Sequence, residues 1–106
     1  MIDESDIQKM TDIIVERFAP ERIILFGSYA HGTPDEDSDL DLIVVKATDQ
    51  DLRNLAADIG MSVVRFPVAK DILVRTPEQF KDECSAFWTV FHEAAQDGRV
   101  LYERSA

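Results

Sequence analysis

The sequence predicts an α/β (α+β) domain in which helices flank a small, mostly covered sheet of about four strands. Segments with apolar residues at helical spacing alternate with short runs of β-branched and aromatic residues, in the order α-β-(short α)-β-α-β-α-β. The 106 residues are 45% hydrophobic and 30% charged, which is typical of one globular domain. We therefore expect a single domain over residues 1–106.

The first half of the chain predicts a helix, a strand, a short connection and a second strand. Ser5 with Gln8 resembles a capping box, and apolar residues then recur at helical spacing until Pro20 stops the helix. Residues 22–26, RIILF, have the β-branched and aromatic character of a strand. After a polar stretch, residues 39–45, DLDLIVV, predict a strand that is covered on both faces.

The second half continues the alternation. Residues 52–59 have apolar side chains at helical spacing, and residues 70–74, KDILV, predict a third strand. Residues 76–79, TPEQ, supply a threonine cap, a proline at the first helical position and a glutamine three residues after the cap. That helix would run to Gly98, with a possible break near Cys84, and residues 99–102, RVLY, predict an edge strand. Phe80, Phe87, Phe91 and Ala94 continue this helix at helical spacing. Most of its aromatic residues would face the core, and the alternative for Trp88 is partial exposure at a partner interface.

The net charge of −10 argues against direct nucleic-acid binding, because affinity for a phosphate backbone requires clustered Lys and Arg. An acidic surface suits a basic protein partner or a focused cation site. No apolar run approaches the length of a membrane span, and the acidic N-terminal segment does not resemble a secretory signal. With a single cysteine, a cytoplasmic location is expected.

Five residues near strand ends carry candidate chemistry. Amides after Gly27, together with the Ser28 hydroxyl, can bind phosphate. Asp39 and Asp41 are two apart in a strand and project from one face, where paired carboxylates repel each other unless a divalent cation binds them. Asp71 begins the third strand and could supply a third carboxylate. The pattern predicts a two-metal site for phosphoryl or nucleotidyl transfer.

The alternative for Asp39 and Asp41 is a solvated acidic loop that runs into a strand. For Asp71 the alternative is a surface residue at a strand start. The distance from Gly27-Ser28 favours the metal site for the first pair. The neighbouring acidic residues 35–37 are expected to form only a polar connection.

Gly27-Ser28, ten intervening residues and Asp39-x-Asp41 match the signature of the DNA polymerase β-like nucleotidyltransferase superfamily. The chain resembles the minimal form of that family, the single-domain MNT proteins or MntA-like antitoxins, from its first helix to RVLYE. The resemblance implies a small mixed β-sheet flanked by helices. It also implies that Gly27 and Ser28 hold the triphosphate of ATP, that Asp39 and Asp41 bind two Mg²⁺ ions, and that Asp71 completes the metal site and helps to deprotonate the attacking hydroxyl.

The same resemblance implies a function. Such a protein would transfer AMP from ATP to a protein hydroxyl, a tyrosine of a HEPN-domain RNase toxin, as the antitoxin of a type VII-like toxin–antitoxin pair. A non-catalytic antitoxin that neutralises the toxin by binding is the alternative, and the net charge favours it. One departure concerns phosphate binding: His31 stands where many relatives carry Arg, so that either nucleotide affinity is weaker or Lys46 or Lys70 compensates.

Overall fold

The computed structural model describes residues 2–32, 34, 35, 37–84, 92 and 97–104. Within them the elements follow the predicted alternation of helices and strands. None of these helices combines the length and the apolar character that a bilayer-spanning segment requires. The elements are α1 (Glu4–Phe18), β1 (Arg22–Phe26), α2 (Ser28–His31), β2 (Leu40–Val45), α3 (Leu52–Ser62), β3 (Lys70–Arg75), α4 (Pro77–Cys84) and β4 (Arg99–Glu103).

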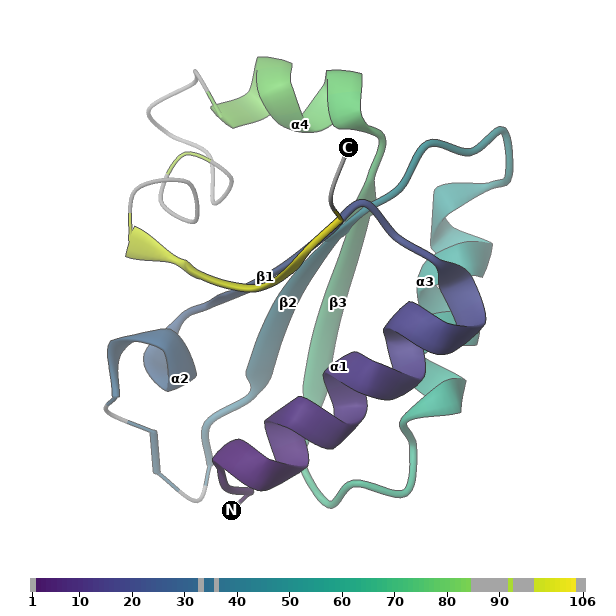
Figure 1. Ribbon diagram of the computed structural model, residues 1–106. Helices are drawn as coiled ribbons and strands as arrows, with labels where there is room; N and C mark the ends of the chain where they lie inside the picture. Colours follow the sequence, from purple (N-terminus) through teal and green to yellow (C-terminus); the bar gives the residue numbers. More distant parts are fainter. Residues whose placement is uncertain (1, 33, 36, 85–91, 93–96, 105–106) are drawn as a thin grey trace.

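The four strands form one mixed sheet in the order β3-β2-β1-β4 (Figure 1). Strand β1 is antiparallel to both β2 and β4, whereas β2 and β3 are parallel. A parallel pair needs a long crossover between its strands, and α3 supplies it. The mixed sheet and the edge position of the last strand are both confirmed.

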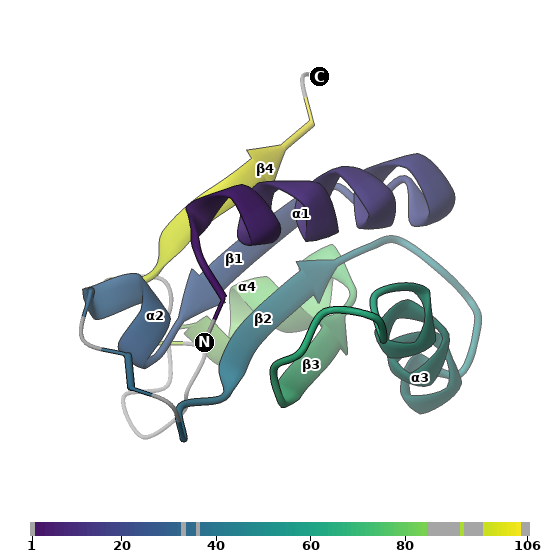
Figure 2. The ribbon, with the colours of Figure 1, turned by 90° about the horizontal axis from the view of Figure 1, so that it is seen from below.

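The two faces of the sheet are covered by different helices (Figure 2). Helices α1 and α3 pack on one face and α4 packs on the other. Because consecutive residues of a strand point to opposite faces, Leu42 and Val44 of β2 join the larger core, whereas Ile43 and Val45 contact the smaller one around Phe80. The prediction of a strand covered on both faces is therefore confirmed.

Helix α1 begins two residues earlier than the predicted cap at Ser5 requires. Asp3 is the cap: its carboxylate accepts a hydrogen bond from the Asp6 amide at 2.9 Å, and the Asp6 carboxylate accepts one from the Asp3 amide at 3.2 Å. A carboxylate caps a helix as well as a hydroxyl does, and buried Ile2 and Ile7 flank the Asp3 cap as a hydrophobic staple. The prediction of a capping box at Ser5 is wrong because these apolar contacts favour the earlier start.

The capping box predicted at Thr76 is confirmed. The Thr76 hydroxyl accepts a hydrogen bond from the Gln79 amide at 3.2 Å, and the Gln79 side chain accepts one from the Thr76 amide at 3.1 Å. Helix α4 ends at Cys84, and Phe80 is its buried residue. The predicted apolar positions beyond it, Phe87, Trp88, Phe91 and Ala94, lie outside the described residues.

Candidate active site

The chain leaves β1 through Gly27 in a conformation that favours glycine. Gly27 has φ 73° and ψ −158°, a region that other residues occupy only under strain. Helix α2 follows at once, and its Ala30 and His31 amides donate to the Gly27 carbonyl at 3.0 and 3.2 Å. The first amides of the turn, those of Ser28 and Tyr29, are not used inside this helix and can serve an external acceptor.

Gly27 also makes room for a predicted metal ligand. The pairing of β1 with β2 sets Phe26 opposite Asp41, so that the Asp41 side chain lies beside the following Gly27. A methyl group added to Gly27 would lie 3.3 Å from Cγ of Asp41 and would overlap one of its carboxylate oxygens. The sequence analysis assigned Gly27 to phosphate binding and did not predict this contact, which depends on the strand register.

Asp41 and Asp71 are neighbours on adjacent parallel strands. The register of β2 and β3 pairs these two residues directly, so that both side chains leave the same face of the sheet. Asp39 is exposed and comes just before the first residue of β2. Burial raises the pKa of Asp41, and the negative charges of Asp71 and then Asp39 raise it further. The structure therefore brings the three predicted carboxylates into one electrostatic neighbourhood.

The carboxylates suit a hard divalent cation, which prefers oxygen ligands and removes like-charge repulsion. In the described part of the chain, however, no three His, Cys, Asp or Glu side chains already converge tightly enough to hold an ion. The repulsion that raises the pKa of Asp41 also opposes such convergence in the metal-free chain. The donor set therefore suits Mg²⁺, and an ion held by all three carboxylates would require the side chains to adjust.

The acidic stretch before Asp39 has a different character. Asp35 and Asp37 are exposed, and the Asp35 carboxylate accepts hydrogen bonds from the Asp37 amide at 2.9 Å and the Ser38 hydroxyl at 3.2 Å. These contacts form a local turn, as predicted for a polar connection. Glu36 lies outside the described residues.

The lysines expected to compensate for His31 are engaged elsewhere. The Lys46 ammonium donates to the Phe18 carbonyl at the end of α1, at 2.7 Å. The Lys70 ammonium donates to carbonyls of the loop between α3 and β3, at 2.9 and 3.0 Å. The expectation that one of them replaces a phosphate-binding Arg is not supported, because backbone carbonyls orient both groups. His31 is exposed at the end of α2.

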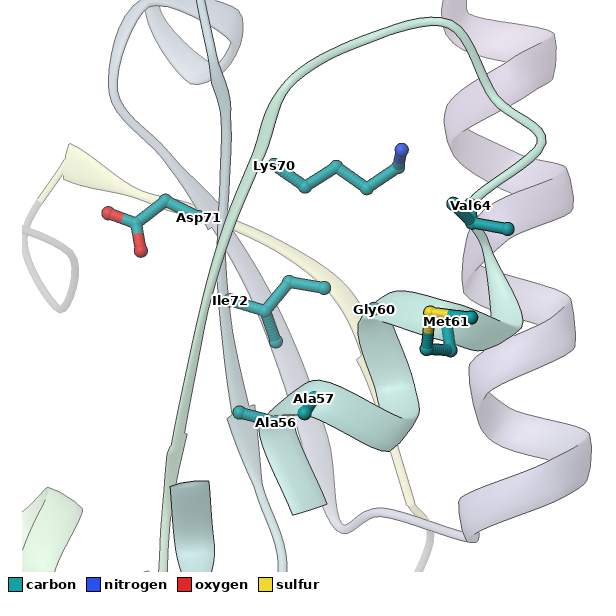
Figure 3. Close-up of a pocket in the computed structure, with 8 residues that line it drawn as sticks. All are labelled: Ala56, Ala57, Gly60, Met61, Val64, Lys70, Asp71 and Ile72. Atoms are coloured by element: carbon teal, nitrogen blue, oxygen red, sulfur yellow. The ribbon is translucent and has the colours of Figure 1, made fainter. Parts of the chain in front are cut away.

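A groove of about 510 Å³, which the sequence analysis did not predict, lies between α3 and β3 (Figure 3). We call it the α3 groove. Met61 and Val64 line it from the side of α3, outside the apolar stripe that predicted the helix. Asp71 is one of the residues on its border.

The chain is similar in sequence to known nucleotidyltransferases. Residues 8–106 match the family model described as polymerase beta, nucleotidyltransferase. The chain is 29% identical over 105 residues to the "Putative protein adenylyltransferase" of Methanocaldococcus jannaschii, covering 96% of this chain and all of that protein.

Solved structures have the same fold. A toxin–antitoxin complex with AMP-PNP aligns with a TM-score of 0.61 and 23% identity, over 97% of this chain and 75% of the matched chain. A complex of a tri-AMPylated Shewanella oneidensis HEPN toxin with an MNT antitoxin aligns with a TM-score of 0.56 and 18% identity, over 97% of this chain and 74% of the matched one.

Proposed function

Because the chain belongs to the polymerase β nucleotidyltransferase family, we propose that it transfers AMP from ATP to a hydroxyl group of a protein. The observation that carries this proposal is the direct pairing of Asp41 with Asp71 next to the Gly27 turn. The relative from Methanocaldococcus jannaschii, which is named as a putative protein adenylyltransferase and matches over 105 residues, supports a protein as the acceptor.

The turn after β1 would hold the nucleotide. The amides of Ser28 and Tyr29 are not used within α2 and can donate to phosphate oxygens, and the Ser28 hydroxyl adds a third donor. Because Gly27 has no side chain, the Asp41 carboxylate can lie close to the backbone at this position. When bound, two Mg²⁺ ions on Asp39, Asp41 and Asp71 would neutralise phosphate charge and stabilise the charge that develops during transfer.

Transfer then requires one bond to form and one to break. The acceptor oxygen attacks the α-phosphorus of ATP, the bond from that phosphorus to the bridging oxygen breaks, and pyrophosphate leaves with the electron pair. The hydroxyl proton passes to the Asp71 carboxylate, which is exposed at the edge of the site and can release it to solvent. Asp39 and Asp41 would hold the cations throughout the transfer.

The proposed acceptor is a tyrosine of a HEPN-domain RNase toxin, which would make this chain the antitoxin of a type VII-like pair. The support is the likeness of fold to chains from toxin–antitoxin complexes, one of which contains an AMPylated HEPN toxin. The net charge of −10 suits a partner with a basic surface.

The experiment combines the purified chain, labelled ATP, Mg²⁺ and a purified HEPN-domain RNase toxin. We expect label on the toxin and loss of its RNase activity. Replacing Asp39 and Asp41 together by Ala should reduce labelling by more than the roughly 10–100-fold that loss of an outer-shell metal partner costs. The matched control replaces Asp35 and Asp37 by Ala, which removes the same charge from the exposed turn. Equal labelling by both double variants would refute the assignment.

Neutralisation by binding alone is the second candidate, and the acidic surface is the observation that favours it. It expects the Asp39→Ala, Asp41→Ala variant to silence the toxin at equimolar concentration without ATP. Catalytic neutralisation expects that variant to bind the toxin and leave it active. A titration of RNase activity against antitoxin concentration, with and without ATP, separates the two.

A further inference from the structure

Strand β3 is the outermost strand of the sheet, and no described strand pairs with its outer side. The carbonyls of Ala69 and Arg75 accept hydrogen bonds from the chain of β2, at 2.8 and 3.0 Å. Because backbone groups of consecutive strand residues point to opposite sides, those of Lys70 and Ile72 face outward. The outer edge of β3 therefore presents backbone donors and acceptors on both sides of Asp71.

The α3 groove lies beside this edge and is mostly apolar. Met61 and Val64 are 69% and 63% exposed, which makes them two of the three large hydrophobic side chains exposed in the described part of the chain. Ile72 faces them from β3 (Figure 3). The Lys70 ammonium donates hydrogen bonds to two loop carbonyls, which hold this charge in place at the border of the groove. Such a surface suits an apolar side chain.

The carboxylate of Asp71 points away from the α3 groove. In Figure 3 it leaves β3 on the side opposite Lys70 and Ile72, as strand alternation requires. A chain that lies along the edge therefore has the apolar groove on one side and the proposed metal carboxylates on the other.

Resting on the proposed function, we infer that the outer edge of β3 binds an extended segment of the acceptor protein as an added strand. Successive side chains of the added strand point to opposite faces of the sheet. The acceptor hydroxyl therefore lies beside Asp71, and the apolar residues that precede and follow the acceptor residue enter the α3 groove. Flanking basic residues complement the net charge of −10 and the three carboxylates. The predicted recognition sequence is an apolar–tyrosine–apolar core with lysine or arginine on both sides.

The probe is a fluorescein-labelled peptide with the sequence Lys-Lys-Leu-Tyr-Leu-Lys-Lys, whose side chains read the same in either strand direction. Binding is measured by anisotropy without ATP, and transfer of labelled AMP is measured separately. Val64→Asp places a charge in the groove, and Val100→Asp, at the 51% exposed valine of the opposite edge strand, is the matched control. Urea unfolding verifies that both variants are folded.

We expect Val64→Asp to weaken peptide binding at least tenfold and Val100→Asp to leave it unchanged. A peptide with its three central amides N-methylated should bind the wild-type chain at least tenfold more weakly, because it cannot pair with the edge. Equal binding by both valine variants, full binding of the methylated peptide, or no wild-type binding up to about 1 mM peptide would overturn the inference. Binding that requires Val64 without any AMP transfer would contradict the proposed function and leave the docking site supported.

Discussion

Replacing Gly27 by Ala should displace the Asp41 carboxylate. Two costs add at this position. The backbone conformation at φ 73° and ψ −158° is strained for any residue with a Cβ, by about 1–3 kcal/mol. The added methyl group also overlaps the Asp41 carboxylate, which must rotate away from it.

Gly32→Ala is the matched control. Gly32 also has a positive φ, 75°, so alanine there is strained by about 1–2 kcal/mol. A Cβ at Gly32 would meet no described atom within 4 Å. The excess cost of Gly27→Ala over Gly32→Ala in the free energy of unfolding therefore contains the displacement of the carboxylate together with the difference in backbone strain.

A double-mutant cycle with Asp41→Ala isolates that displacement. Only the Cβ of Asp41, at 3.6 Å from the added methyl group, would remain in that background, which is ordinary contact. Urea unfolding without metal should show a coupling between Gly27→Ala and Asp41→Ala of about 0.5–3 kcal/mol, the range for residues in contact. Gly32→Ala should cost the same in both backgrounds.

The two glycine variants should also differ in how strongly Mg²⁺ and ATP stabilise them. Gly27→Ala should lose most of the thermal stabilisation that Mg²⁺ and ATP provide, whereas Gly32→Ala should keep it. Two results would refute the reasoning: Gly27→Ala being no more costly than Gly32→Ala, or additivity with Asp41→Ala within about 0.3–0.5 kcal/mol.

Three further predictions concern stability. The raised pKa of Asp41 means that the folded state holds this proton more tightly than the unfolded state, so the metal-free protein should gain stability as pH falls from neutrality toward 3.8, the ordinary pKa of an aspartate. Asp41→Asn should flatten that dependence and abolish stabilisation by Mg²⁺ in thermal melts, and an unchanged slope would contradict the carboxylate cluster. Tyr29→Phe should be neutral or stabilise the fold by up to about 1 kcal/mol, because the buried Tyr29 hydroxyl has no hydrogen-bond partner among the described residues. A larger loss in urea unfolding would reveal a partner. Thr76→Ala should cost about 1 kcal/mol by removing the cap of α4, and Thr76→Ser should restore most of it if the hydroxyl is responsible.

Local patterns were sufficient for most of the fold. The β-branched run of β1, the Thr76 cap and the alternation of elements depend on contacts between residues close in sequence, and all are confirmed. The prediction of a cap at Ser5 was wrong because Asp3 and Ser5 are both chemically suitable caps, and burial of Ile2 and Ile7 favours Asp3. This preference depends on packing in the folded core, which the local sequence does not show.

The family could also be recognised from the resemblance of a short motif. Gly27-Ser28 and Asp39-x-Asp41 lie within 15 consecutive positions, and the family match over residues 8–106 confirms the nucleotidyltransferase that they predict. The roles of Gly27, Ser28, Asp39, Asp41 and Asp71 as ligands remain predictions that the experiments above test.

The sequence by itself therefore determined the elements, their order and the chemical class of the site, because these follow from residue types at short spacing. Only the tertiary structure decided which groups meet. Asp71 pairs with Asp41 through the parallel register of β2 and β3, and Gly27 is confined by Asp41 through the register of β1 and β2. Lys46 and Lys70 donate hydrogen bonds to backbone carbonyls, and the α3 groove lies beside the edge of β3. Strand register and packing between distant segments set these contacts, and no local pattern encodes them.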